Sequence, residues 1–266
     1  MAFAGRRVTC NGARIAGVVS CVPARRVGNS DFEERFGADG VADVVKLIGV
    51  SERRHVSGSQ STADLCAAAG ERLLERLGWE RDRVDALLFF SQTPSYVLPP
   101  TSCVLQSALG VPPGIIAFDV NLGCSGYPYA LWLAMTLVQT GAAKRVLLAV
   151  GDTISRIVDP QDRSTALLFG DAGTMTAVEA LPEDESAEGL ASFVLGTDGT
   201  GVRNLIVPQG AFGSYPAGED TRMQGKDPSC LFMDGGEIFN FTLRAVPPLV
   251  AATCEAAGDD ARPIFR

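Results

Sequence analysis

The chain has 266 residues, of which 46% are hydrophobic and 20% are charged, a balance typical of a compact globular protein and not of a disordered one. Its formal net charge of −8 at pH 7 argues against nucleic acid as the main partner. No stretch approaches a transmembrane span, and the N-terminus lacks the apolar segment of a signal peptide, so we expect a cytoplasmic protein without a membrane partner.

The first half of the chain alternates strand and helix patterns. Ala13 to Cys21 is predicted as the opening strand, and Ser61-Thr62 can cap a helix that Gly78 ends. The next elements are a buried strand over Val84 to Phe90, a helix over Thr101 to Leu109, a strand over Ile115 to Val120, a helix from Tyr127 to about Thr140, and a strand over Arg145 to Val150. This alternation predicts an α/β layered fold around a mostly buried sheet.

The second half begins after an acidic stretch over residues 181–189, which indicates an exposed turn. We therefore expect two halves, residues 1–182 and 187–266. The second half is predicted to contain a strand over Ala191 to Thr197, a long surface loop over Pro208 to Cys230, and a helix that opens with Met233 to Phe241. Pro247 and Pro248 should kink or interrupt that helix, because an interior proline removes a hydrogen bond and clashes with the preceding turn.

Cys124 is the most informative single residue. It lies in a glycine-flanked turn between the strand that ends at Val120, predicted to be buried, and the helix that begins near Tyr127. Unpaired N–H groups and the positive end of the helix dipole stabilise a thiolate at such a position. A thiolate is the nucleophile that thioester chemistry needs, so Cys124 is the predicted catalytic residue. An inert buried thiol is the alternative.

The seven cysteines indicate neither a disulfide framework nor a zinc site, because their number is odd and no CxxC pair occurs. We therefore predict no metal. Most of the cysteines, Cys66 and Cys103 included, should be reduced and buried apolar side chains. The arginine pairs at 6–7, 25–26 and 53–54 are expected to be solvated.

Several segments together carry a resemblance to one enzyme family. They are Gly49 to His55, Ser91 to Gly110, Asp119 to Ala130, Asp159 to Gly173 and Met233 to Phe239. In this order, and over nearly the whole chain, they resemble β-ketoacyl-acyl-carrier-protein synthase III, a condensing enzyme of the thiolase superfamily. Ala172 stands where the family's FGDGAG-type strand usually has glycine.

The resemblance implies a thiolase-like α-β-α-β-α layered fold, with the nucleophilic cysteine in residues 1–182 and an incomplete second half in residues 187–266. It implies acyl transfer from an acyl thioester to Cys124, whose N–H supplies one oxyanion donor. Malonyl-acyl carrier protein would then decarboxylate, and its carbanion would attack the thioester. The expected partners are acyl carrier protein, acyl-CoA or another acyl thioester, and a second copy in a homodimer, with no cofactor beyond these substrates.

The resemblance also implies four substrate-binding residues. Arg163 matches a CoA-contact position, Leu98 would enter the acyl pocket of the partner subunit, and Phe169 and Met233 complete the set. The segment Val41 to Ile48 lacks the tryptophan and arginine that sandwich the adenine of CoA in some members, which leaves a carrier protein open as the acyl donor.

The HQAN-like and GNTS-like segments that supply the family's second catalytic unit have no counterpart in this sequence. The only histidine, His55, belongs to a different segment and is predicted to be a surface or structural residue. Residues 259–266 do not resemble the family's continuation. We therefore expect a C-terminally truncated enzyme with impaired condensation.

Two other functions fit the same residues. One is an acyltransferase of this fold that passes the acyl group to an alcohol or amine, and the other is a non-catalytic thiolase-fold subunit that binds a partner. Asp152 and Asp171 are predicted to form turns and not to act as general bases. The segment Phe169 to Gly173 is predicted to be architectural, because its glycines allow a close turn.

Overall fold

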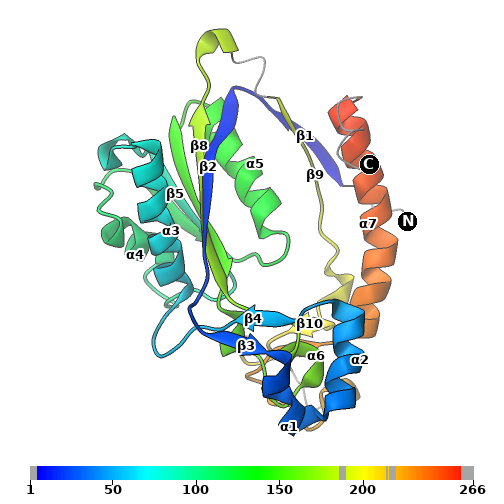
Figure 1. Ribbon diagram of the computed structural model, residues 1–266. Coiled ribbons are helices and arrows are strands. Elements are labelled where there is room, and N and C mark those ends of the chain that lie inside the picture. The colour runs from blue at the N-terminus through cyan, green and yellow to red at the C-terminus, as the bar shows by residue number, and fades with distance from the viewer. Residues whose placement is uncertain (1–4, 186–189, 214, 216–219, 259–266) are drawn as a thin grey trace.

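The computed structural model describes residues 5–185, 190–213, 215 and 220–258. A five-stranded mixed sheet carries the core (Figure 1). Its strands, in spatial order, are β2 (Ala13–Cys21), β8 (Ala172–Ala180), β7 (Arg145–Asp152), β5 (Ala86–Phe90) and β6 (Ile116–Val120). β7, β5 and β6 run parallel, and β8 is antiparallel to both of its neighbours. The predicted α/β layering is therefore confirmed.

Helices cover both faces of this sheet. They are α3 (Thr62–Leu77) and α4 (Thr101–Ala108) on one face and α5 (Gly126–Gln139) on the other. The central strand β5 shows the reason, because successive side chains of a strand point to opposite faces. Leu87 and Phe89 pack into the cluster with α3, whereas Leu88 and Phe90 pack into the cluster with α5. An apolar run without polar alternation is thus buried on both sides.

The helix ends follow the predicted signals. Ser61 caps α3 reciprocally: its hydroxyl accepts the backbone N–H of Asp64 at 3.3 Å, and its own N–H donates to the Asp64 carboxylate at 2.7 Å. Gly78 ends the same helix with a φ of +62°, a conformation that favours glycine.

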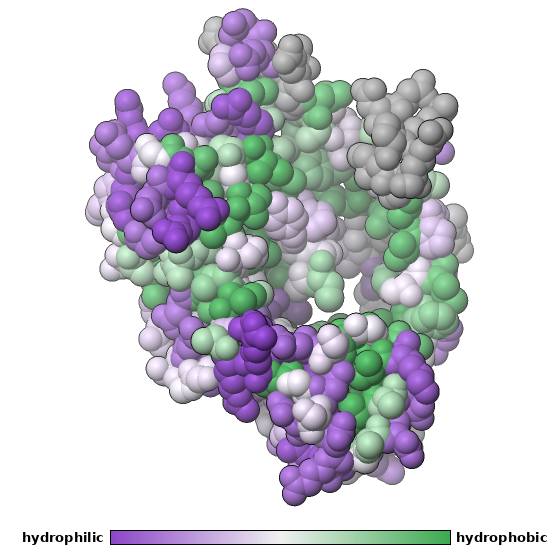
Figure 2. All heavy atoms as spheres, in the orientation of Figure 1, coloured by the Kyte–Doolittle hydropathy of each residue, from purple (hydrophilic) through white to green (hydrophobic). Residues whose placement is uncertain are grey.

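Smaller elements surround the sheet (Figure 1). They are the pairs β1 (Arg6–Cys10) with β9 (Ala191–Leu195), β3 (Arg26–Gly28) with β4 (Glu52–Arg54) and β10 (Leu205–Ile206) with β11 (Phe232–Met233), and the helices α1 (Glu33–Phe36), α2 (Ala38–Ile48), α6 (Arg163–Ala166) and α7 (Gly235–Ala257). α7 packs along β9, and a hollow separates it from the sheet on the face seen in Figure 2. No helix of the described residues is long and apolar enough to cross a bilayer.

Three expectations about these elements are wrong. β2 is not the opening strand, because β1 precedes it and pairs with β9, far away in the sequence. β6 is only half-buried, since it is one of the two edge strands of the sheet. Pro247 and Pro248 do not interrupt α7. Each proline removes only one N–H, and the exposure of neighbouring Leu243 (61%) shows that water reaches this part of the helix.

Burial also differs from the expectation for several residues. Among the cysteines only Cys10 and Cys66 are buried, whereas Cys103 and Cys124 are exposed, and all seven are free thiols. Burial raises the pKa of the Cys66 thiol to about 12. In the acidic stretch, residues 183–185 form a short 3₁₀ turn, and residues 186–189 lie outside the described residues.

Candidate active site

The candidate site forms where three parallel strands end. Because β5 lies between β7 and β6, their carboxyl ends meet at one edge of the sheet. β5 leads into residues 91–93, β6 leads into the turn that contains Cys124, and β7 ends with Asp152. The crevice outside the carboxyl ends of parallel strands is the usual place for ligands in α/β proteins.

Cys124 lies exposed in the turn before α5. The backbone N–H of Gly126 donates to the carbonyl of Gly123 at 2.7 Å and closes this turn around the cysteine. Ser125 is the N-cap of α5, its side chain makes no capping hydrogen bond, and the first turn of the helix holds no acidic residue. The positive end of the dipole is therefore not neutralised next to the thiol. Cys124 is not a buried thiol, because its side chain is exposed.

Asp152 accepts hydrogen bonds from the segment that follows β5. A single carboxylate oxygen, Oδ1, receives the Ser91 hydroxyl at 2.9 Å and the backbone N–H groups of Gln92 and Thr93 at 2.7 and 3.2 Å. Burial raises the pKa of Asp152, and these hydrogen bonds partly offset that effect. The carboxylate thus orders a turn that follows a different strand, which the local sequence pattern could not show.

Three of the four predicted substrate-binding residues, Arg163, Phe169 and Met233, lie in or shortly after the contacting elements α6 and β11, whereas Leu98 lies between β5 and α4. Arg163 is the first residue of α6, and a Cβ atom added to Gly40 of α2 would stand 3.1 Å from its Nη1 atom. Met233 lies in β11, and the carbonyl of Phe169 accepts a hydrogen bond from the His55 ring at 3.2 Å. Leu98 is 79% exposed.

One ion pair joins the segments that carry Arg163 and Met233. Asp162 caps α6 by accepting the N–H of Ser164 at 3.1 Å, and its other oxygen receives the Lys226 ammonium at 2.7 Å. Burial opposes ionisation of this carboxyl, but the hydrogen bonds from Lys226 and Ser164 hold its pKa below the ordinary value. The contact fixes the loop that precedes β11 against α6.

His55 belongs to a different hollow of the surface. A cavity of about 300 Å³ is lined by side chains that include His55, Phe32, Ser155 and Phe169, and Cys124 does not line it. The hydrogen bond from the His55 ring to Phe169 agrees with the predicted structural role.

Arg53, expected to be solvated, is only 4% exposed. Its guanidinium lies 5.0 Å from the centre of the Phe32 ring and donates to the Asn29 side chain at 2.7 Å. Burial lowers its pKa, an effect that the charge of Asp31 partly offsets. Arg53 therefore anchors β4 through these contacts and does not belong to a solvated surface.

Within the segment Phe169 to Gly173, Asp171 and Gly173 have an architectural role. A Cβ atom at Gly173 would lie 2.6 Å from the Leu65 Cβ and 2.8 Å from the backbone nitrogen of Cys66, so only glycine lets β8 approach α3 this closely. Buried Asp171 accepts the N–H of Val56 at 2.7 Å and the Ser155 hydroxyl at 2.6 Å. It ties two loops together.

Comparisons with known proteins agree with this arrangement. The sequence profile of the family described as 3-oxoacyl-[acyl-carrier-protein (ACP)] synthase III matches residues 118–199. The beta-ketoacyl-[acyl-carrier-protein] synthase III of Caldanaerobacter subterraneus is 32% identical, with 92% of this chain and 72% of that protein aligned. The enzyme of the same name from Xanthomonas axonopodis is 35% identical, with 93% and 73% aligned.

The solved structures show the same relationship. The crystal structure of a 3-oxoacyl-(acyl-carrier protein) synthase from Burkholderia xenovorans superimposes with a TM-score of 0.94 at 61% identity. The match covers 97% of this chain and 73% of that chain.

Proposed function

Because the chain belongs to the 3-oxoacyl-[acyl-carrier-protein] synthase III family, we propose that Cys124 is the nucleophile that takes an acyl group from an acyl thioester. Members of this family are acyl-transferring condensing enzymes of fatty-acid biosynthesis, and the chain is an enzyme of this kind. The observation that supports the role of Cys124 is its exposed position between the end of β6 and the uncapped start of α5.

The proposed reaction begins with attack of the Cys124 thiolate on the carbonyl carbon of the thioester. A carbon–sulfur bond to Cys124 forms, the bond to the donor sulfur breaks, and the donor leaves as a thiol after taking up a proton. The backbone N–H of Cys124 can donate to the oxyanion that forms on the way. Loss of CO₂ from a malonyl thioester then supplies a carbanion, which attacks acyl-Cys124 and releases the thiol.

We propose that the acyl donor, acyl-CoA or acyl carrier protein, binds along the segments that carry Arg163, Phe169 and Met233. The exposed Arg163 guanidinium offers a cation to a phosphate of the donor, and the Asp162–Lys226 contact holds its helix in place. The cytoplasm is the proposed compartment, since these donors are water-soluble thioesters.

Intact-mass measurement of the protein after exposure to acyl-CoA or acyl carrier protein tests the proposal. We expect a mass increase of one acyl group. Release of labelled CO₂ on subsequent addition of carboxyl-labelled malonyl thioester would support decarboxylative condensation by this chain. Transfer of the acyl group from the adduct to an added alcohol or amine would instead favour the acyltransferase alternative. Absence of an adduct with either donor would contradict the role of Cys124.

We further propose a homodimer built on the β6 side of the sheet. β6 is an outer strand, and an unpaired strand edge is a template for pairing with another chain. The segment between β5 and α4 exposes three large apolar side chains, Tyr96 (60%), Val97 (75%) and Leu98 (79%). An interface on this side of the sheet would bury their apolar surface. Leu98 would then enter the acyl pocket of the partner subunit.

Leu98→Asp is expected to shift the protein from dimer to monomer, because a charge would be buried in an apolar contact. Light scattering coupled to size-exclusion chromatography measures this change. Phe212→Asp, at a residue that is 91% exposed and lies between β10 and β11 in the chain, is the matched control and should leave the dimer intact. A variant at Leu98 that stays dimeric at low micromolar concentration would argue against this interface.

A further inference from the structure

Asp152 is a half-buried carboxylate that the proposed reaction does not use. Besides the three hydrogen bonds already described, its Oδ1 atom receives the Thr93 hydroxyl at 3.2 Å. One oxygen therefore holds three consecutive residues, 91–93, directly after β5. Hydrogen bonds to an ionised acceptor are roughly twice as strong as neutral ones, so this segment is held firmly.

A cluster of threonine hydroxyl groups also holds the segment over residues 91–93. The Thr93 hydroxyl lies 2.9 Å from that of Thr62, at the start of α3, and accepts the backbone N–H of Thr153 at 2.8 Å. Thr62 and Thr153 are 0% and 3% exposed, and their hydroxyl groups are 3.1 Å apart. A buried and satisfied polar network of this kind specifies one arrangement of the chain.

Gln92 connects the segment over residues 91–93 to the turn that contains Cys124. A Cβ atom at Gly123 would lie 2.1 Å from the Gln92 Oε1 atom and 2.7 Å from its Cδ, so the Gln92 side chain lies directly on Gly123. The backbone N–H of Ser91 also donates to the Val120 carbonyl at 3.2 Å, which extends the pairing of β5 with β6 to the edge of the turn.

We propose that Asp152 is a positioning residue, which acts through Gln92 and Gly123 to hold the thiol and the backbone N–H of Cys124 in the geometry for attack on a thioester. The inference rests on the proposed role of Cys124. Gly123 immediately precedes the cysteine and accepts the hydrogen bond that closes its turn, so a shift of Gly123 moves the nucleophile. A displacement of about 1 Å can slow a reaction roughly 100-fold.

Asp152→Asn tests the proposal, because it keeps the size of the side chain and one acceptor oxygen but removes the charge. We expect Cys124 to be acylated at least about tenfold more slowly at saturating acyl-CoA, with little change in the concentration that gives half-saturation. Quenched-flow mass spectrometry measures the rate. If Asp152 had a purely structural role, Asp152→Asn would lower the stability of the protein and leave the acylation rate per folded molecule unchanged.

Gln92→Ala provides the second variant, which keeps every backbone hydrogen bond to Asp152. It should slow acylation to a similar extent. The variant with both substitutions should be no slower than the slower single variant, since each substitution removes the same connection between Asp152 and Gly123. Because the Gln92 side chain is exposed, we expect this variant to fold, so that it still tests the proposal if Asp152→Asn does not fold.

Asp85→Asn is the matched control. Asp85 precedes β5 and accepts the backbone N–H groups of Lys144 and Arg145 at 2.7 and 2.9 Å, so it joins the same two strands at the opposite end of the sheet. Its replacement should lower stability but leave acylation unchanged. Wild-type rates in both Asp152→Asn and Gln92→Ala, or an equal loss in Asp85→Asn, would overturn the inference. A wild-type protein that is not acylated would instead refute the proposed function.

Discussion

Replacement of Cys124 by alanine is expected to abolish formation of the acyl-enzyme and to leave the fold intact. The thiol of Cys124 lies between the carboxyl end of β6 and the start of α5, and it is the group proposed to form the thioester. The side chain is exposed, so its removal opens no cavity in the core. Substitutions at such positions usually change stability by less than about 0.5 kcal/mol, which corresponds to a shift in melting temperature of about 2 °C or less.

Intact-mass measurement after incubation with acyl-CoA gives the readout, and a thermal melt shows whether the variant is folded. Cys103→Ala is the control, because Cys103 is the other exposed cysteine of the chain and lies in α4. That variant should acquire the acyl group as the wild type does. An adduct that persists on a folded Cys124→Ala protein would remove Cys124 from the reaction.

Gly173→Ala is expected to destabilise the fold by about 1–3 kcal/mol, the usual effect of forcing an extra group into a packed core. The added Cβ would meet the Leu65 Cβ at 2.6 Å, the Leu65 carbonyl carbon at 2.9 Å and the Cys66 nitrogen at 2.8 Å. Two of these atoms belong to the backbone of α3, and the helix cannot move away without disturbing its own packing against β8. The substitution therefore acts on the junction of the sheet with its largest covering helix.

Urea unfolding followed by circular dichroism gives the free energy of unfolding of this variant. Gly213→Ala is the control, since a Cβ atom there meets no atom within 4 Å and the backbone does not require a positive φ. We expect the control to unfold as the wild type does. Equal stability of the two variants would show that β8 can move away from α3 at little cost.

The elements that the sequence predicts well are those with local signals. α3 begins at its Ser61 cap and ends before Gly78, as the caps and the apolar spacing predict. α4 and α5 likewise follow their patterns to within about a residue or two. Hydrophobic periodicity and capping act over a few residues, so they survive in almost any tertiary setting.

The errors concern residues whose surroundings come from distant segments. No local signal identifies β1, because its pairing with β9 joins residues more than 180 positions apart. Arg53 was expected in solvent, but the loop that carries Asn29 and Phe32 folds over it. Cys103 is exposed although its residue type is usually buried.

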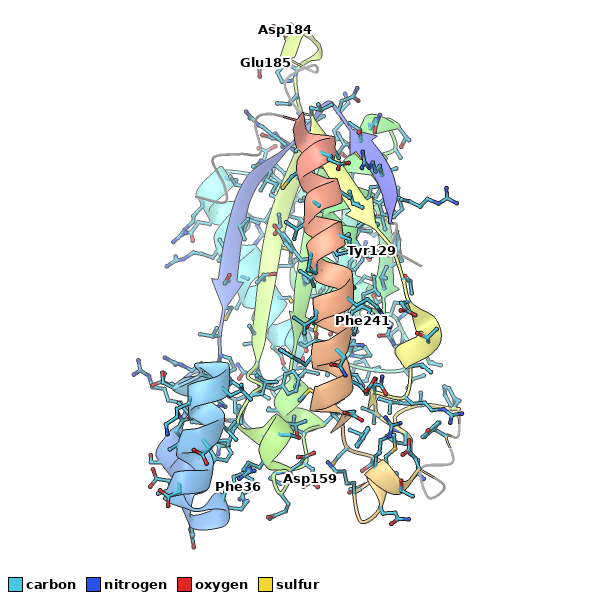
Figure 3. All side chains as sticks on the ribbon, turned by 90° about the vertical axis from the view of Figure 1, so that its right-hand side faces the viewer. Phe36, Tyr129, Asp159, Asp184, Glu185 and Phe241 are labelled. Carbon is cyan, nitrogen blue, oxygen red and sulfur yellow. The ribbon has the colours of Figure 1, made fainter. Side chains whose placement is uncertain are left out.

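The surroundings of α5 illustrate the same limit. Figure 3 shows α7, which carries Phe241, in front of the sheet. The hydroxyl of Tyr129, on α5, donates to the Gly196 carbonyl at 3.2 Å, directly after β9. The periodicity of each helix predicts an apolar face. It does not identify the element that this face meets.

Residue types at short spacing are sufficient to predict the α/β layering, the family resemblance and the choice of Cys124. The surroundings of the cysteine follow from long-range contacts instead: the open end of α5, the Gln92 side chain on Gly123, and the Asp152 oxygen that holds residues 91–93. These groups are brought together by the order of β7, β5 and β6 in the sheet. Strand order is set by long-range pairing, which no local pattern encodes.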